Sequence, residues 1–358
     1  MRILVDSFAD ACLPNAQMGN AREIVSRLDP ERFLVSMFMV GKPDVRIASR
    51  KNTRLIQLPQ HKQTPRILSE FLWGVHEILF YMKASPASRW YSSVRRRWRD
   101  KRTTVGTVES QSNFKDEPTI KPEGIRLYEQ SVLRCDHLFS NSETVQRSLL
   151  REYGLQSEVI ATGVDTQFFS PAWDRAANQR LRVLFVGSLR PFKQPDLLLS
   201  AARRFPEADF RIAGEGQMRP ELEARIAREE IKNAKLLGLL DEKQLREEYR
   251  SADVFLFPSK WEGSPKVVLE AAACGLPVIV RSNYSPETVI HAVTGYQAGS
   301  DEELYSSLAG LLLNPERRSR LGGAGRQHSL KFDWDVITAQ WEQTFIRLSS
   351  EQELRRAS

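Results

Sequence analysis

Residues 254–280 read VFLFPSKWEGSPKVVLEAAACGLPVIV, and this stretch decides the fold class. The apolar run 254–258 predicts a buried strand, and residues 267–274 predict a helix. The run 277–280, after the break at Gly275, predicts a second strand. A strand, a helix and a strand in succession indicate a parallel sheet whose faces are covered by helices.

The same alternation extends in both directions along the chain. Before residue 160 we expect strands at 3–6, 33–40, 53–58, 103–108 and 136–140, with helices at 21–28, 66–77, 122–135 and 143–153. After residue 180 we expect strands at 182–187, 210–213 and 234–237, with helices at 196–204, 220–230 and 241–250. The sequence therefore predicts an α/β protein with two doubly wound, Rossmann-like domains that face each other across a cleft.

The chain is long enough for this organisation, because 358 residues with 41% hydrophobic content supply two cores. We expect an N-terminal Rossmann-like domain at 1–170 and a C-terminal one at 171–332. Residues 333–358 are expected to form a helix that packs back toward the first domain. Ligands of such sheets bind at the carboxyl ends of the strands, so the loops that follow these ends are expected to line one site.

Composition and charge narrow the class of protein. Charged residues make up 27% of the chain and aromatic residues 9%, which excludes collagen-like and disordered chains. The 52 Lys and Arg outnumber the 45 Asp and Glu by 7, an excess that suits anionic partners. Cys12, Cys135 and Cys274 are too widely spaced to support a disulfide framework or a zinc site. No apolar run approaches the ~20 residues of a membrane-spanning helix, so we expect a cytoplasmic protein, either free or at the inner face of the membrane.

Two glutamates in the opening stretch are candidate binding residues. Glu262 lies in the loop and Glu270 lies in the following helix, among nearly all apolar neighbours. A carboxylate in such a run needs a polar partner, because unpaired burial is costly. The helix N-terminus near Lys266 and Val267 favours a phosphate, and both carboxylates suit sugar hydroxyls. The combination predicts a site for a nucleotide sugar.

Arg190 and Lys193 follow the strand expected at 182–187. Arg grips phosphate oxygens in pairs and Lys adds a mobile charge, so these cations suit a departing diphosphate. The alternative is an ordinary solvated loop. The expected position at the same sheet edge as Glu262 favours the binding interpretation.

The motifs together resemble one family, the retaining glycosyltransferases of the GT-B fold in family 4, also called glycosyl transferases group 1. The matching stretches are FVGSLRPFK from Phe185 to Lys193, AGEG from Ala213 to Gly216, SADVFLFPS from Ser251 to Ser259, and residues 262–277. The resemblance is strong from about residue 136 to 313 and weak before that. It implies that the first domain takes the acceptor and the second domain takes the nucleotide-sugar donor.

The resemblance also implies roles for individual residues. Arg190 and Lys193 would bind the diphosphate, Glu270 the ribose and Glu262 the transferred sugar, while Gly19 would allow close approach of the backbone to a phosphate. The expected donor-binding residues are Gly19, Arg190, Lys193, Gly214, Gly216, Glu262, Gly263, Ser264, Lys266, Val267 and Glu270. The family has two adjacent glycines where this chain has Met18-Gly19-Asn20, so Gly19 as an ordinary loop residue stays open.

Family members carry a His at the end of an N-terminal-domain strand, near the reacting carbon. Here the strand expected at 103–108 is followed by Glu109, with no His nearby. The expected catalytic residues are therefore Glu262, Arg190, Lys193 and Glu109. Asp333-Trp-Asp335 fits a metal-binding pattern of another glycosyltransferase fold, but we interpret it as the start of a helix and expect no metal.

The predicted function is transfer of a sugar, with retention, from a UDP-, GDP- or ADP-sugar to a glycan, a lipid-linked or a small-molecule acceptor, without a cofactor. One alternative is a catalytically silent nucleotide-sugar-binding or assembly subunit. Another is a different enzyme on the same fold, such as an epimerase or a phosphorylase, because fold alone does not decide function.

The segment 89–102 has the strongest concentration of charge, with Trp90, Tyr91 and Trp98 interleaved among arginines. Such a pattern suits the surface of an anionic membrane. It equally suits an anionic saccharide or RNA, or a solvated basic helix. We expect peripheral contact with an anionic membrane through this segment and do not expect nucleic acid as a partner.

Overall fold

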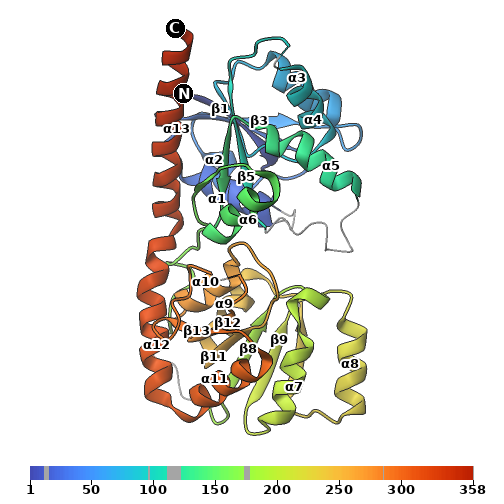
Figure 1. Cartoon of the computed structure of the whole chain (residues 1–358), viewed down its shortest axis with the longest axis vertical. Coiled ribbons are helices and arrows are strands. Elements are labelled where there is room, and N and C mark those ends of the chain that lie inside the picture. The colour runs from blue at the N-terminus through green and yellow to red at the C-terminus, as the bar shows by residue number, and fades with distance from the viewer. Residues whose placement is uncertain (12–15, 96, 111–121, 173–177, 285, 358) are drawn as a thin grey trace. The chain divides into compact units, whose positions relative to one another are not determined.

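The computed structural model describes residues 1–11, 16–95, 97–110, 122–172, 178–284 and 286–357. The chain forms two compact units, which we call unit 1 and unit 2 (Figure 1). Unit 1 comprises residues 1–161 and 334–358, and unit 2 comprises residues 162–333. The division lies before the one expected after residue 170, because Val164 forms a bridge with Asp333 and Phe169 is buried in the core of unit 2.

Unit 1 is built on a seven-stranded sheet in the order β3-β2-β1-β4-β5-β6-β7. Every strand pair is parallel, and in the register Val5 lies opposite Met37 on one side and Phe80 on the other. The strands are β1 (Arg2–Phe8), β2 (Leu34–Met39), β3 (Thr53–Gln57), β4 (Ile78–Phe80), β5 (Thr103–Val108), β6 (His137–Ser140) and β7 (Glu158–Val159). Most strand residues are buried, as expected when helices cover both faces.

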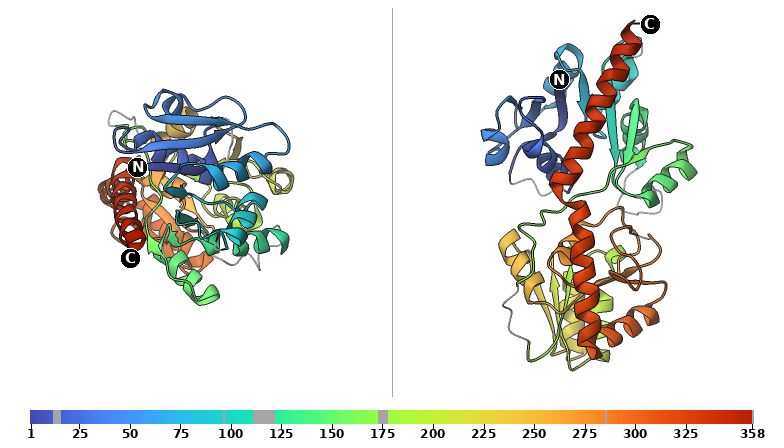
Figure 2. Two further views of the ribbon diagram at one scale, coloured as in Figure 1. Left: turned by 90° about the horizontal axis from the view of Figure 1, so that it is seen from above. Right: turned by 90° about the vertical axis from the view of Figure 1, so that its left-hand side faces the viewer.

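The helices of unit 1 alternate with these strands. They are α1 (Ala16–Arg27), α2 (Val45–Ser49), α3 (Thr64–Trp73), α4 (Pro86–Val94), α5 (Pro122–Gln130), α6 (Glu143–Tyr153) and, from the end of the chain, α13 (Trp334–Ala357). Helix α13 lies beside α1 (Figure 2). Its residues Trp341 and Phe345 pack against Phe80 of the sheet, with ring centroids 4.8 and 4.9 Å away.

Unit 2 holds a six-stranded parallel sheet in the order β10-β9-β8-β11-β12-β13. Its strands are β8 (Arg182–Val186), β9 (Asp209–Ala213), β10 (Ala234–Gly238), β11 (Val254–Phe257), β12 (Val278–Arg281) and β13 (Gly295–Ala298). Its helices are α7 (Asp196–Arg204), α8 (Arg219–Arg228), α9 (Glu242–Ser251), α10 (Lys266–Ala273), α11 (Asp301–Leu313) and α12 (Pro315–Ser329). The predicted α/β class with two parallel sheets is confirmed.

Several details differ from the expectations, and three of them lie in unit 1. Helix α1 begins at Ala16, before the expected start at 21, so Gly19 lies inside a helix. Helix α3 ends at Trp73 because Gly74 adopts an extended conformation there. The chain then enters β4, a three-residue strand that the sequence did not predict.

No helix in the described part of the chain combines the length and the apolar character that crossing a membrane requires.

Candidate functional site

The candidate site is built on the carboxyl edge of the unit 2 sheet, where three glycine-containing loops are joined. The amide of Gly187 donates to Ala213 O at 3.0 Å, and the amide of Gly214 donates to Gly238 O at 2.8 Å. Loops after β8, β9 and β10 are thereby tied to one another through backbone hydrogen bonds. The result is a fixed backbone surface at the edge where ligands of parallel sheets bind.

Gly214 and Gly216 are required by this close packing. A Cβ added to Gly214 would lie 1.9 Å from Gly187 O, and Gly214 has a φ of +135° that disfavours other residues. A Cβ added to Gly216 would lie 2.5 Å from Leu189 O. The structure therefore places both expected glycines in the loop between β9 and α8, where they keep the surface free of side chains.

Glu262 and Lys193 meet at this edge. The Lys193 ammonium forms an ion pair with Glu262 Oε1, and the Ser259 hydroxyl donates to the same oxygen at 2.6 Å. The two side chains come from the turn after β8 and the loop after β11, 69 residues apart in the chain. Because both side chains are largely shielded from water, solvent and salt screen their attraction less than that of a surface ion pair.

Aromatic rings surround the ammonium of Lys193. Its Nζ lies 5.2 Å from the ring centroid of Phe192 and 5.0 Å from that of Phe257, within range for cation–π attraction. Phe192 also stacks on Trp261, with centroids 6.3 Å apart and planes at 12°. Sequence reasoning missed Phe192 and Trp261 as site residues, although both adjoin residues that it named.

Arg190 precedes the same turn and is exposed. Within the described residues its side chain makes no hydrogen bond or ion pair, so its guanidinium is available to an anion. A planar guanidinium binds two oxygens of a phosphate at once.

The start of α10 is a second feature suited to an anion. Pro265 occupies the N-cap and supplies no side-chain hydrogen bond to the amides of Lys266 and Val267. Gly263 is buried just before it, and the buried hydroxyl oxygen of Ser264 has no hydrogen-bond partner among the described residues. A helix N-terminus with uncapped amides and a positive dipole end attracts a phosphate group.

Glu270 lies one turn further along α10 and has a specific partner. The hydroxyl of Tyr249 on α9 donates to Glu270 Oε2 at 2.9 Å and lies 3.2 Å from Val267 O. Burial raises the pKa of Glu270, while the Tyr249 hydroxyl and the Lys266 ammonium act in the opposite direction. The partner that the apolar context of Glu270 required is therefore Tyr249, which sequence reasoning did not name.

The position of Gly19 in unit 1 differs from the expected one. The residue lies in the first turns of α1 and not in a loop, because the run from Ala16 to Met18 continues the helix toward the N-terminus. The expected location in a loop is therefore wrong, whereas the expected close approach of its backbone to a phosphate stays a prediction. Gly19 is not brought together with the residues of the unit 2 edge by anything that the structure describes.

Glu109 follows β5 and is held by a polar network in unit 1. Its carboxylate accepts hydrogen bonds from the Tyr81 hydroxyl and from Asn20 Nδ2, the latter at 3.2 Å. Asn141 Nδ2 donates to the Glu109 carbonyl at 3.0 Å. Tyr81 has a φ of +63°, which is rare for an aromatic residue and is found at functional sites. Sequence reasoning did not name Tyr81, Asn20 and Asn141 as site residues. The one feature of the sequence that could have indicated them is that they are polar and lie near the ends of strands and helices.

A cavity of about 260 Å³ adjoins this network. Its lining comes from α1, the ends of β4 and β5, α5 and the turn after α5: Gln17, Tyr81, Met82, Lys83, Ala84, Thr107, Ser110, Gly124, Ile125, Tyr128 and Val132. Its walls are mainly apolar with a few hydroxyl, amide and amine groups, the usual make-up of a small-molecule site. No pattern in the sequence indicated this cavity, because its lining comes from segments that are distant in the chain.

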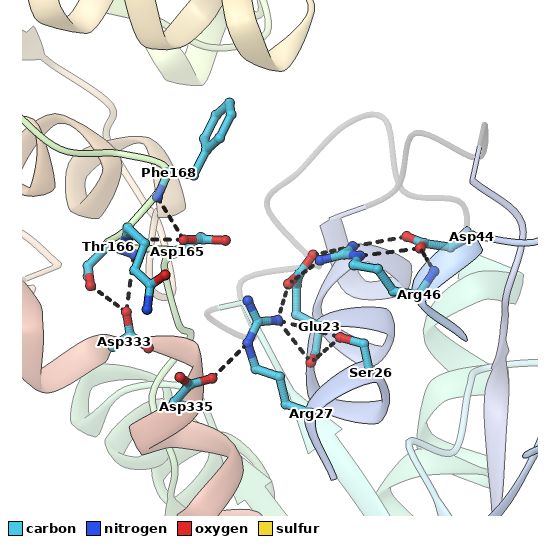
Figure 3. Close-up of polar contacts among 11 residues, drawn as sticks. Glu23, Ser26, Arg27, Asp44, Arg46, Asp165, Thr166, Phe168, Asp333 and Asp335 are labelled. Carbon is cyan, nitrogen blue, oxygen red and sulfur yellow. Dashed lines mark hydrogen bonds and ion pairs between the residues drawn. The ribbon is translucent and has the colours of Figure 1, made fainter. Parts of the chain in front are cut away.

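The two aspartates at 333 and 335 have separate partners (Figure 3). In unit 2 the Asp333 carboxylate accepts hydrogen bonds from the Thr166 amide, at 3.1 Å, and from the Thr166 hydroxyl. In unit 1 Asp335 pairs with Arg27 Nε at 3.0 Å. Among the described residues, no three His, Cys, Asp or Glu side chains are grouped as a metal site would need.

Part of the chain matches a known protein family. Residues 170–328 match the family model described as glycosyl transferases group 1. D-inositol 3-phosphate glycosyltransferase of Thermobispora bispora is 32% identical over 279 residues, which cover 68% of this chain and 64% of that protein. The chain thus spans less than two thirds of the length of this curated relative.

Two solved structures share the fold. Sucrose-phosphate synthase from Thermosynechococcus elongatus has a TM-score of 0.81 and 20% identity, over 98% of this chain and 99% of that one. HepE of Anabaena, crystallised with UDP, has a TM-score of 0.77 and 16% identity, over 97% and 100% of the two chains. These likenesses establish the two-unit GT-B architecture. The match to the glycosyl transferases group 1 family covers residues 170–328, the same part of the chain that carries the candidate site of unit 2.

Proposed function

We propose that this protein is a retaining glycosyltransferase that moves a sugar from a nucleotide-sugar donor to an acceptor hydroxyl. One observation carries the proposal: two cations, two carboxylates and an uncapped helix start share the carboxyl edge of the unit 2 sheet. This set supplies a partner for each part of a nucleotide sugar.

The assignment follows the chemistry of each group. Glu270 accepts hydrogen bonds from the ribose hydroxyls, because its carboxylate is half-buried and is oriented by the Tyr249 hydroxyl. The amides of Lys266 and Val267 and the exposed Arg190 bind the diphosphate. Lys193 exchanges its contact with Glu262 for a phosphate oxygen, which leaves Glu262 to accept a hydroxyl of the transferred sugar.

In the proposed reaction the bond between the anomeric carbon and the diphosphate oxygen breaks, and a bond to the acceptor oxygen forms on the same face. The acceptor proton moves to an oxygen of the departing diphosphate. Negative charge develops on that diphosphate, so fixed cations and helix amides stabilise the transition state more than the ground state. We assign Glu109 to the acceptor side as the polar group near the positive anomeric centre.

The comparisons suggest which ligands to test first. UDP is the first nucleotide, because HepE was crystallised with it. Inositol phosphate belongs in the acceptor panel, because the curated relative is named for that substrate. Saccharide and lipid-linked acceptors complete the panel, with no metal or cofactor added.

Calorimetry with UDP, GDP, ADP and their sugars tests the donor site. We expect one nucleotide to bind selectively, and Arg190→Ala and Glu270→Ala each to weaken its binding about 10- to 100-fold, the loss typical of a charged hydrogen bond. Arg320→Ala, an exposed cation on α12, is the matched control. If no nucleotide binds to the folded protein, the transferase proposal fails and the silent assembly subunit takes its place. With a donor in hand, NMR of the product's anomeric configuration decides between retention and inversion.

A further inference from the structure

The basic segment 89–102 plays no part in the proposed function. Arg96 lies outside the described residues, and the structure divides the other charges of the segment into two groups. Arg95 is buried and structural. Its guanidinium donates to Thr104 Oγ1 and to Arg102 O, both at 2.6 Å, and pairs with Asp136 at 2.8 Å. These bonds join the end of α4 to β5 and β6.

Arg102 is structural as well. It pairs with Asp100, whose carboxylate also accepts a hydrogen bond from Tyr91 at 2.8 Å. Its Nη1 donates to Gly74 O at 3.1 Å, which holds the turn after α4 against the end of α3. The described residues of segment 89–102 are therefore the end of α4 (Pro86–Val94) and a turn in which Arg95 and Arg102 are held by hydrogen bonds, and not one solvated basic helix.

The other described cations of the segment are exposed; Arg89 lies on α4, and three more lie in the turn that follows it. Arg97, Arg99 and Lys101 are exposed, and within the part of the chain that the structure describes none of them pairs with a carboxylate. Three tryptophans lie around the same turn: Trp73 is 74% exposed, Trp90 46% and Trp98 56%. We call these six residues the aromatic–basic patch. Large aromatic residues that cluster in contact with water mark interaction surfaces.

The patch lies at one end of unit 1. Trp73 precedes β4 and Lys101 precedes β5, so both lie at the amino ends of these parallel strands. Helices α3 and α4, which end in this region, lie side by side (Figure 1). Glu109 and the cavity lie at the carboxyl ends of the same strands. A surface that docks through the patch therefore leaves the carboxyl edge of unit 1 uncovered.

The ring geometry favours a lipid surface over a single-stranded nucleic acid. Trp90 and Trp98 contact each other edge to face, with centroids 6.3 Å apart and planes at 77°. Nucleic-acid bases stack on the exposed faces of individual aromatic rings. Tryptophans that contact each other suit the headgroup layer of a membrane, where aromatic side chains accumulate. Unpaired Arg and Lys around such a cluster complement anionic headgroups.

We propose that the aromatic–basic patch docks this protein on a bilayer that contains anionic lipid. The proposal is independent of the donor site. It predicts that binding needs both the tryptophans and the cations, and that added salt weakens it, because headgroup charges are screened within a Debye length.

The test is co-sedimentation of the full chain with vesicles of phosphatidylcholine containing roughly a third phosphatidylglycerol, enough to give a negative surface potential. We expect the wild type to sediment with these vesicles and not with pure phosphatidylcholine. Arg97→Glu/Arg99→Glu and Trp90→Ala/Trp98→Ala should each reduce binding at least about tenfold, given about 1 kcal/mol per basic residue near the surface. Arg317→Glu/Arg320→Glu is the matched control, with the same change of charge on exposed residues of α12.

A second measurement separates lipid from other polyanions. Lipids brominated in the acyl chain should quench the tryptophan fluorescence of the wild type, and the Trp90→Ala/Trp98→Ala variant should lose most of this quenching. If Arg317→Glu/Arg320→Glu lost as much vesicle binding as Arg97→Glu/Arg99→Glu, the proposal would be overturned, because the net charge of the protein alone would then explain the binding. Binding of RNA or heparin that is tighter than binding to the vesicles, without quenching by brominated lipid, would also overturn it. Circular dichroism of every variant shows that the fold is intact.

Discussion

The hydroxyl of Tyr249 donates a hydrogen bond to the carboxylate of Glu270 at 2.9 Å, across 21 residues of sequence. Tyr249 is fully buried, so its ring carries the hydroxyl to the carboxylate from the core side of α10. The ribose-binding role proposed for Glu270 depends on this hydrogen bond, because it orients one carboxylate oxygen and leaves the other for a ligand.

Tyr249→Phe should therefore destabilise the protein and weaken nucleotide binding together. The variant leaves a shielded carboxylate without its donor, so we expect a loss of about 1.5–3 kcal/mol in the free energy of unfolding. Urea unfolding and calorimetry with the bound nucleotide measure the two effects. Tyr296→Phe serves as the control, since its hydroxyl has no hydrogen-bond partner among the described residues. Unchanged stability and affinity in Tyr249→Phe would contradict the role given to this hydrogen bond.

The raised pKa of Glu270 predicts a pH dependence of stability. Burial raises the pKa of Glu270 above the ordinary glutamate value of 4.5, so the ionised carboxyl costs folding free energy at pH 7. That cost disappears as the pH falls through the folded-state pKa toward 4.5. The advantage of Glu270→Gln over the wild type in unfolding free energy should therefore be largest at pH 7 and shrink on acidification. Urea unfolding between pH 7 and pH 5, with exposed Glu221→Gln as control, measures it; an advantage that grows on acidification would refute the assignment.

Gly214 and Gly323 form a matched pair for testing the glycine surface. Gly214→Ala places a Cβ 1.9 Å from Gly187 O at a φ of +135°, so we expect a loss of at least about 2 kcal/mol in stability and no measurable nucleotide binding. Gly323 lies inside α12 with no atom within 4 Å of an added Cβ. Gly323→Ala should stabilise the protein by about 0.5–1 kcal/mol, as alanine does inside helices. Thermal unfolding of both variants tests this, and nucleotide binding by Gly214→Ala would exclude a role for the loop.

Glu109→Gln should lower kcat at least about tenfold with little change in the KM of the donor, because the proposed role concerns charge at the acceptor side. Steady-state kinetics with saturating acceptor measure both constants. Exposed Glu31→Gln is the control. A rise in donor KM with unchanged kcat would instead place Glu109 in donor binding.

Helix α13 should be an integral part of unit 1. Trp341 is 3% exposed and contacts the rings of Phe80 and Phe139 at 4.8 and 4.9 Å. Trp341→Ala should cost about 3–5 kcal/mol, the usual loss for a buried aromatic residue. Val336→Ala, at an exposed position of the same helix, should change stability by no more than about 0.5 kcal/mol. Similar urea midpoints for the two variants would show that α13 contributes little to the core.

Many of the strands and helices could be predicted because the apolar and polar residues within each segment show the periodicity of a strand or a helix. The strand expected at 103–108 has the same bounds in the structure, since its apolar and β-branched run ends at charged neighbours. The three-residue β4 was missed because its strand character comes from pairing with β1 and β5. Gly19 was expected in a loop, but it lies in α1. The start of this helix was hard to locate because the helix begins several residues before its periodic apolar pattern does.

The sequence by itself determined that the chain forms two α/β units. It also determined that glycines lie in the loops after β8 and β9, and that one glutamate lies before α10 and another within it. These follow from neighbours within a few residues. Only the tertiary structure decided that Tyr249 bonds Glu270, that Lys193 pairs with Glu262, and that Arg95 is buried while Arg97 is exposed. The physical reason is that hydrogen bonds and burial depend on which side chains a sheet brings together, and parallel strands join segments far apart in the chain.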